Sequence, residues 1–218
     1  MAEQDDELLV MDKYHLTQRV AVGGMGEIFL AEQSGPRNLK RQVILKSMRP
    51  EMLDDPDLLV SFIDEARVLA SLNHPNIVAI HEVGEWNDTP FIVMEYIEGI
   101  HLAKLLKQCT NTDTSIPFGI AARIVRDAAL GLDYAHQASD SRGEPLNIVH
   151  RDISPENIRV AWTGSVKILD FGIAKAATQM HETKAGEIKG KLCFMAPEQV
   201  LGKSIDQRSD IFSLGIVL

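Results

Sequence analysis

The sequence has few cysteines, no long apolar run and no excess of positive charge. Its two cysteines, Cys109 and Cys193, show no C-x-x-C or metal-ligand spacing, which argues against structural zinc and favours a reducing compartment. No apolar run approaches a membrane span, and the acidic first residues are unlike a signal peptide. Lysine and arginine number 22 against 31 acidic residues, for a net charge of -9, which disfavours non-specific attraction to nucleic acid or anionic membrane. We therefore expect a cytoplasmic protein without a nucleic-acid partner and without a membrane segment in this chain.

The 218 residues suffice for a substantial core, because 45% of them are hydrophobic and 24% are charged. Composition allows one or two domains and says nothing finer. Residues 1–13 are expected to be a solvated lead-in, and residues 138–147 a polar surface excursion to which we assign no function. Periodicity and turn residues predict strands over 15–22, 27–32, 42–46, 77–85, 91–95, 158–161 and 166–169, and helices over 57–72, 102–108 and 117–137.

Residues 149–157 carry groups that phosphoryl transfer requires. Asp152 supplies a carboxylate that can accept the proton of an incoming hydroxyl. Asn157 and Asp170 supply an amide oxygen and a second carboxylate, which suit Mg²⁺ on nucleotide phosphates. The predicted strands that follow Asn157 and precede Asp170 flank a Thr-Gly turn, so we expect these two residues at neighbouring strand ends.

The pattern His-Arg-Asp-x-x-x-x-Asn at 150–157, with Asp-Phe-Gly at 170–172 and Ala-Pro-Glu at 196–198, resembles the eukaryotic-like serine/threonine protein kinases. The resemblance runs from about Tyr14 to Leu218. It implies an α+β fold with two lobes, a small antiparallel β lobe over 14–95 and a helical lobe over 96–218. Because the chain ends inside an apolar helical run, we expect a C-terminally incomplete helical lobe, a fragment of a longer protein with exposed apolar surface.

The resemblance also implies ATP and Mg²⁺ as cofactors. Lys46, at the end of an apolar strand, would hold the α- and β-phosphates and pair with Glu65 on the following helix. Glycines would let the backbone approach the phosphates, because they carry no Cβ. The resemblance implies three further groups of nucleotide contacts. The glycine turn and its flanks comprise Val20, Ala21, Gly23, Gly24, Gly26 and Ile28. The connection between the lobes comprises Met94, Glu95 and Ile97, and Arg159 would lie beneath the adenine.

Two of these positions, and a third residue beside the adenine slot, depart from the family pattern. Ala21 replaces the first glycine of the turn, and Ile44 replaces an alanine and would narrow the roof of the adenine slot. Arg159 stands where the family has an apolar floor under the adenine. Its guanidinium would either stack on the base or swing out and leave the floor incomplete.

A cation and a hydroxyl have exchanged places near Asp152. Ser154 stands where the serine/threonine branch usually has lysine, and Lys191 where it has threonine. We hypothesise that Lys191 stabilises the transferring phosphoryl group while Ser154 supplies a hydrogen bond. The alternative is that Ser154 disables the loop and Lys191 is solvated.

The same resemblance implies roles for Asp210 and Arg151, and the place of His136 at the end of a predicted helix suggests another. Asp210 would hold the backbone of the catalytic loop, and His136 is expected to make a structural hydrogen bond. Arg151 would bind a phosphate on the segment 173–195, whose only hydroxyls belong to Thr178 and Thr183. We hypothesise that phosphorylation of either threonine orders this segment; otherwise both are ordinary loop residues.

The sequence thus predicts an ATP-dependent kinase that acts on serine or threonine hydroxyls of proteins, with autophosphorylation that would involve a kinase dimer. A pseudokinase or ATP-binding scaffold is the alternative, favoured by Ala21, Ile44, Ser154 and Arg159 and opposed by the intact Lys46, Asp152, Asn157 and Asp170. A small-molecule phosphotransferase would share the catalytic loop but normally lacks the Ala-Pro-Glu segment.

Overall fold

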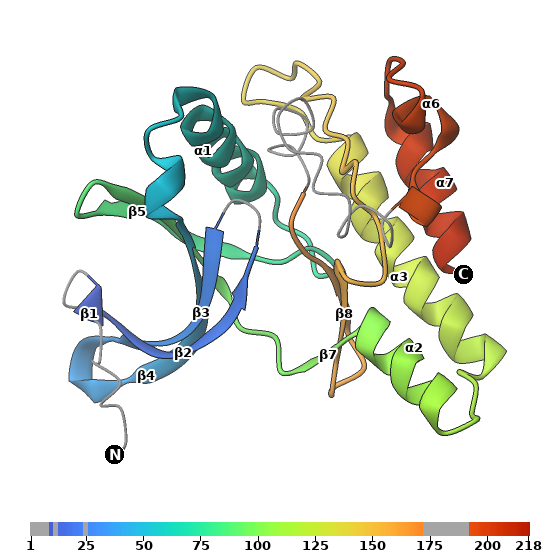
Figure 1. The fold of residues 1–218 in the computed structure, drawn as a ribbon, viewed down its shortest axis with the longest axis horizontal. Coiled ribbons are helices and arrows are strands. Elements are labelled where there is room, and N and C mark those ends of the chain that lie inside the picture. The colour runs from blue at the N-terminus through green and yellow to red at the C-terminus, as the bar shows by residue number, and fades with distance from the viewer. Residues whose placement is uncertain (1–8, 11–12, 24–25, 172–191) are drawn as a thin grey trace. The chain divides into compact units, whose positions relative to one another are not determined.

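The computed structural model describes residues 9–10, 13–23, 26–171 and 192–218, and contacts divide the chain into two compact units. The first unit comprises Met1–Ala70 and Ala79–Tyr96, and the second comprises Ser71–Val78 and Ile97–Leu218. Figure 1 shows strands in the first unit and mainly helices in the second. The α+β class expected from the sequence is confirmed.

The first unit is built on a six-stranded antiparallel sheet with the order β1-β2-β3-β4-β6-β5. A long helix, α1, follows β4 in the chain and buries Phe62, Glu65, Ala66 and Leu69. The predicted strands and the helix are confirmed to within a few residues at their ends. Their bounds are β1 Leu9–Val10, β2 Tyr14–Val22, β3 Gly26–Ser34, β4 Lys40–Met48, α1 Pro56–Ser71, β5 Ile80–Trp86 and β6 Thr89–Glu95, with short 3₁₀ turns at Pro36–Asn38 and Pro50–Met52.

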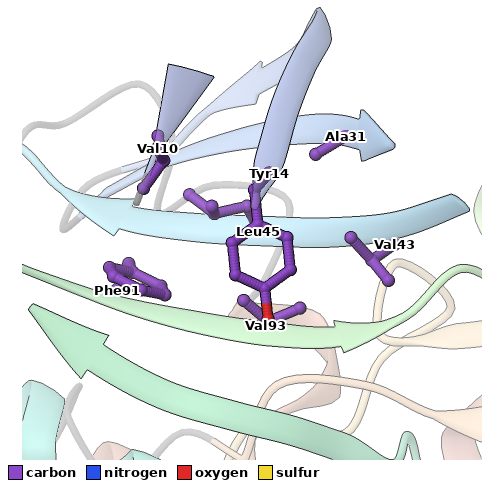
Figure 2. Packing of buried hydrophobic residues seen from close by; sticks show 7 residues of the cluster. All are labelled: Val10, Tyr14, Ala31, Val43, Leu45, Phe91 and Val93. Atoms are coloured by element: carbon purple, nitrogen blue, oxygen red, sulfur yellow. The ribbon is translucent and has the colours of Figure 1, made fainter. Parts of the chain in front are cut away.

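A hydrophobic core cluster of this unit is formed by buried side chains of the sheet strands (Figure 2). It includes Val10, which belongs to the segment 1–13 that was expected to be a solvated lead-in. Strand β1 pairs with β2, and Val10 is only 4% exposed among Tyr14, Leu45 and Phe91. The expectation of a solvated lead-in is therefore wrong for Val10. A two-residue strand is too short to show an alternating pattern, so the sequence did not reveal it.

Tyr14 joins the core to a polar cluster. Its ring is fully buried, and its hydroxyl donates to Glu82 Oε2 at 2.6 Å and accepts from Gln33 Nε2 at 3.4 Å. The Lys13 ammonium also donates to Glu82 Oε2. Burial opposes ionisation of Glu82, but the hydrogen bonds from Lys13 and Tyr14 outweigh it, so the pKa of this carboxyl lies below its ordinary value of 4.5.

We expect Glu82→Gln to lower the free energy of unfolding by about 1 kcal/mol at pH 7, because charge-assisted hydrogen bonds become neutral ones. The depressed pKa means that this stabilisation is complete above pH 4.5 and is lost as the pH falls below that value. Urea unfolding at pH 7 and near pH 3 measures both limits. Glu85→Gln, which changes an exposed residue on β5, is the matched control. The role of Glu82 would be contradicted if both variants lost the same stability, or if Glu82→Gln remained less stable than the unaltered protein near pH 3.

The second unit combines helices with a three-stranded antiparallel sheet of order β7-β8-β9. Strand β7 was missed, because three residues give no readable alternation. Its first residue must be glycine, since a Cβ on Gly99 would lie 2.2 Å from the carbonyl oxygen of Val160. The bounds are β7 Gly99–His101, α2 Leu102–Asn111, α3 Phe118–His136, β8 Ile158–Ala161, β9 Val166–Ile168, a 3₁₀ turn at Leu192–Phe194, α6 Pro197–Val200 and α7 Gln207–Val217.

Two local expectations about this unit are corrected. The strand predicted to begin at Ile77 begins only at Ile80, because residues 76–78 pair with β9 instead: Val78 N–H donates to Ile168 O at 2.9 Å and Ile168 N–H to Asn76 O at 2.8 Å. On α3, the residues Ile124, Ala128, Leu132 and Ala135 are buried as expected, but Ile120 is 49% exposed.

The last described helix, α7, leaves apolar side chains at the surface, and Ile211, Phe212 and Ile216 are each between 42% and 54% exposed. This agrees with the exposed apolar surface expected from the sequence. Within the described ranges, no helix combines the length and apolar character needed to cross a membrane.

Candidate active site

In the first unit, the glycine turn joins β2 to β3. Gly23 N–H donates to Gly26 O at 2.8 Å, and Ala21 pairs with Ile28 across the hairpin. A Cβ on Gly26 would lie 2.6 Å from Ser47 O, so glycine is required here for the close approach of β3 to β4. Val20 is 51% exposed, whereas Ile28 is half-buried. Gly24 lies outside the described residues.

Lys46 and Glu65 meet in the same unit. Lys46 lies on β4 between Ile28 of β3 and Ile92 of β6, and its Nζ is 2.9 Å from Glu65 Oε1 of α1. The side chains are 12% and 5% exposed. The predicted pairing is therefore present, and the pair leaves little of either charged group in water.

The lobe connection divides between the units. Met94 is 7% exposed and pairs with Ile44 across β4 and β6. The Glu95 carboxylate accepts from Ala79 N–H at 2.7 Å, so this side chain supports the local backbone. Ile97 belongs to the second unit, where its carbonyl is hydrogen bonded as described below.

In the second unit, Asn157 and Asp152 are directly linked. Asn157 Nδ2 donates to the carbonyl oxygen and to Oδ2 of Asp152, both at 2.7 Å, and Leu169 N–H donates to Asn157 O at 2.9 Å. Both amide hydrogens of Asn157 are thus used in hydrogen bonds. Its Oδ1 carries no hydrogen and can therefore act as a ligand to a metal cation. Asp170 follows β9 with a φ of 34°, a left-handed conformation that is uncommon for a residue other than glycine.

Asp210 holds the backbone of the catalytic loop. Its carboxylate is 1% exposed and accepts from His150 N–H and Arg151 N–H, each at 2.8 Å. It also contacts His136 Nε2 at 2.8 Å. Both sequence predictions, for Asp210 and for the structural hydrogen bond of His136, are confirmed. Arg151 has a φ of 68°, so these contacts secure an uncommon backbone conformation.

The ring of His150 connects the loop to the strand that leads to Asp170. Nδ1 accepts from Asp152 N–H at 3.2 Å, and Nε2 is 2.9 Å from Leu169 O, which assigns the proton to Nε2. Complete burial lowers the pKa of this imidazole, so it is neutral at physiological pH. The ring also lies 4.5 Å from that of Phe171.

The Arg159 guanidinium is hydrogen bonded to two backbone carbonyls and to one histidine ring. Its Nε donates to Ile97 O at 2.8 Å and its Nη2 to Gly99 O at 3.0 Å, while Nη1 is 2.8 Å from His101 Nε2. His101 Nδ1 lies 2.8 Å from Glu156 O, so this ring donates there and accepts from the arginine. Burial, and next the charge of Arg159, lower the pKa of His101, against a raising effect of the Glu156 hydrogen bond. Stacking of this guanidinium on the adenine stays a prediction, as does the alternative in which it turns away from the base.

We expect Arg159→Met to cost about 1–3 kcal/mol of unfolding free energy, because two backbone carbonyls at Ile97 and Gly99 lose their donor. Chemical denaturation measures the loss. Arg67→Met is the matched control, since Arg67 forms an exposed i,i+3 pair with Asp64 and should change stability by less than about 0.5 kcal/mol. Equal stabilities of the two variants would show that the guanidinium does not secure this segment.

Ser154 is a buried residue of the catalytic loop. The residue is 2% exposed, and its Oγ has no hydrogen-bond partner among the described residues. It lines a small cavity with Arg151, Asp152 and Gln199. Lys191, Thr178 and Thr183 lie outside the described residues, so the exchange of Ser154 with Lys191 and the phosphorylation hypothesis stay predictions.

Gln199 is a loop contact that the sequence did not reveal. Its Nε2 donates to Arg151 O at 2.8 Å, and its Oε1 accepts from Ala196 N–H at 3.0 Å. A glutamine one residue after the Ala-Pro-Glu pattern is equally compatible with solvent exposure, so nothing in the pattern pointed to it.

The donor set determines which metal the site suits. The described residues contain no group of three or more His, Cys, Asp or Glu side chains that could hold a metal ion. The Oδ1 of Asn157 and the carboxylate of Asp170 are two hard oxygen donors, which fits an ion that takes its other ligands from phosphates and water, as Mg²⁺ does.

Comparison with known proteins identifies the family. The family model described as "Protein kinase domain" matches residues 14–218. This chain belongs to the protein kinase domain family. The kinase fold is shared with the Mycobacterium tuberculosis PknI kinase domain, to which the chain is similar with a TM-score of 0.69 and 27% identity, covering 98% of this chain and 74% of that one.

Two curated relatives show how the kinase domain compares with longer proteins. The chain is 45% identical over 205 residues to the tyrosine-protein kinase MasK of Myxococcus xanthus, and 38% identical over 212 residues to the serine/threonine-protein kinase PknB of Mycobacterium leprae. The matches cover 94% and 95% of this chain and 32% of each relative. The kinase domain thus spans about a third of the length of these relatives.

Proposed function

We propose that this kinase domain transfers the γ-phosphoryl group of ATP to serine or threonine hydroxyls of proteins. The observation that carries the proposal is the link between Asn157 and Asp152, whose two hydrogen bonds of 2.7 Å join a metal-ligand amide to a candidate base. Asp210 fixes the backbone of the same loop from a buried position. Catalysis of phosphoryl transfer depends mainly on such positioning of the reacting groups and on electrostatic stabilisation.

Each group has a role in the proposed reaction. Asn157 Oδ1 and the Asp170 carboxylate would hold Mg²⁺, which neutralises developing charge on the phosphates when bound. Asp152 orients the acceptor hydroxyl and takes its proton as the bond from oxygen to phosphorus forms. Lys46, whose ammonium is already oriented by Glu65, binds phosphate oxygens.

The identity of the acceptor hydroxyl needs a direct test, because the similar proteins carry both kinds of name. Incubation of the intact protein with γ-labelled ATP, Mg²⁺ and a mixed protein substrate, followed by phosphoamino acid analysis, is expected to give phosphoserine and phosphothreonine. Phosphotyrosine alone would assign the specificity named for MasK. No transfer, with Mg²⁺-dependent ATP binding retained, would favour the scaffold alternative.

We further propose that Ser154 and Lys191 act together beside Asp152. The buried Ser154 hydroxyl without a partner among the described residues supports this, since such a group is available to a substrate or to a side chain of the neighbouring segment. Lys191→Ala is expected to reduce transfer strongly, whereas Lys107→Ala on the exposed face of α2 should not. Equal rates of these two variants would discard the exchange.

Autophosphorylation on Thr178 or Thr183 is part of the same proposal. Replacement of both threonines by alanine should abolish self-labelling on this segment and lower the rate toward an added substrate. An unchanged rate would remove the regulatory role while leaving the phosphotransferase assignment intact.

A further inference from the structure

A pocket of about 470 Å³ lies on the second unit and is lined by none of the candidate active-site residues. Three segments form it: the last turns of α3, residues 71–74, and the excursion at 138–147 that follows α3. The volume falls within the range of about 300–1,000 Å³ that is typical of ligand sites. The pocket is therefore large enough to take several side chains.

The excursion at 138–147 is a folded hairpin. Asp140 N–H donates to Glu144 O and Leu146 N–H donates to Ala138 O, both at 2.9 Å. Asp140 Oδ1 accepts from the N–H groups of Glu144 at 2.9 Å and Arg142 at 2.8 Å, and these bonds lower the pKa of this carboxyl. One wall of the pocket is thus pre-formed, so binding there would not have to order a loose loop.

The pocket gathers exposed apolar surface. Leu130 is 50% exposed, Leu146 of the hairpin 38% and Tyr134 37%. The Tyr134 ring stacks on His74 with centroids 5.0 Å apart and planes at 24°, which makes a rigid aromatic wall. Adjacent exposed apolar side chains from separate segments are typical of an interaction site.

Its charge is of one sign. Asp133 is the only formally charged side chain among the described residues that line the pocket, with neither lysine nor arginine present. Gln137 Nε2 donates to Asp133 Oδ1 at 2.6 Å and so orients the carboxylate. His74 Nδ1 accepts from Asn76 N–H at 3.2 Å, and burial followed by the charge of Lys167 lowers its pKa, so the ring stays neutral.

We propose that this pocket binds a short peptide segment that places a lysine or arginine head on Asp133 and apolar side chains against Leu130 and Leu146. A long cationic side chain suits such a surface, because its aliphatic stem covers apolar groups while its head reaches the carboxylate. Peptide binding at this pocket requires no phosphoryl transfer. It can therefore be tested separately from the proposed kinase activity.

Fluorescence anisotropy on the intact protein tests the proposal with a fluorescein-labelled peptide, Leu-Leu-Arg-Gly-Leu-Ile, and its counterpart with glutamine in place of arginine. The arginine peptide is expected to bind about tenfold more tightly, and more weakly at high salt. Asp133→Asn should remove the difference between the two peptides, as expected if the two charges interact directly. Leu146→Ser should weaken both peptides.

Matched controls keep the outcome specific. Asp88→Asn and Val60→Ser remove an exposed charge and an exposed apolar group on the first unit, and both should leave binding unchanged. Asp152→Asn should also bind the peptide normally, although it loses the proposed transfer. Protection of residues 138–147 from hydrogen exchange by the arginine peptide is a second readout on the unaltered protein, independent of how well any variant folds.

Equal affinity of the two peptides for the unaltered protein, or an unchanged affinity in Asp133→Asn, would overturn the proposal. Tighter binding of an acidic phosphopeptide would overturn it as well, because the pocket would then select the opposite charge.

Discussion

Asp152→Asn is expected to lower the rate of phosphoryl transfer by a factor of about 10²–10⁴, the range that a positioned general base contributes. Asparagine keeps the shape of the side chain and can still accept from Asn157 Nδ2, which lies 2.7 Å from Asp152 Oδ2. The variant should therefore lose the proposed proton acceptor while the loop stays in place. Steady-state transfer from labelled ATP to a protein substrate measures the effect.

The control for Asp152→Asn is Asp88→Asn, which removes an exposed carboxylate from the β5–β6 turn and should leave the rate unchanged. The fall is expected in kcat, with the affinity for ATP retained. A variant that keeps more than about a tenth of the rate would show that Asp152 is not the proton acceptor.

Asp210→Ala is expected to cost about 3 kcal/mol or more of unfolding free energy. The carboxylate is 1% exposed, and its loss leaves two backbone donors, a buried one at His150 and a part-buried one at Arg151, without an acceptor. His136 loses its partner in the same step. Because each unsatisfied buried polar group costs about 1–3 kcal/mol, the sum places this substitution among the most severe in the chain.

Asp206→Ala provides a comparison on the same helix. Asp206 caps α7 by accepting from Arg208 N–H at 2.9 Å, and removing a cap costs about 1 kcal/mol. Urea unfolding should therefore separate the two variants by about 2 kcal/mol. Similar losses in both would mean that Asp210 acts as an ordinary residue of the first helical turn.

The sequence predicted the parts of this kinase domain that depend on local pattern. Alternation and helical periodicity located β2 to β6 and α1 to α3, and the resemblance to the kinase family implied the Lys46–Glu65 pair and the role of Asp210. In each case the residues occupy regular elements whose side-chain direction follows from the element itself.

Other features depend on partners that are distant in the chain. Arg159 binds carbonyls at Ile97 and Gly99 about sixty residues earlier, a pairing that no local pattern encodes. Ile77 and Val78 read as strand residues of the first sheet, but Val78 pairs with β9 of the second unit. The hairpin at 138–147 owes its order to Asp140, whose polar surroundings looked like an ordinary surface loop.

The central claim, that Asn157 and Asp170 hold one Mg²⁺ on ATP, is tested most directly by calorimetric titration of ATP into the intact protein with and without Mg²⁺. The account predicts that removing Mg²⁺ weakens ATP binding, that Asp170→Asn weakens the Mg²⁺-dependent binding at least about tenfold, and that Asp152→Asn binds normally. ATP binding of equal affinity in EDTA, or an Asp170→Asn variant indistinguishable from the unaltered protein, would contradict it.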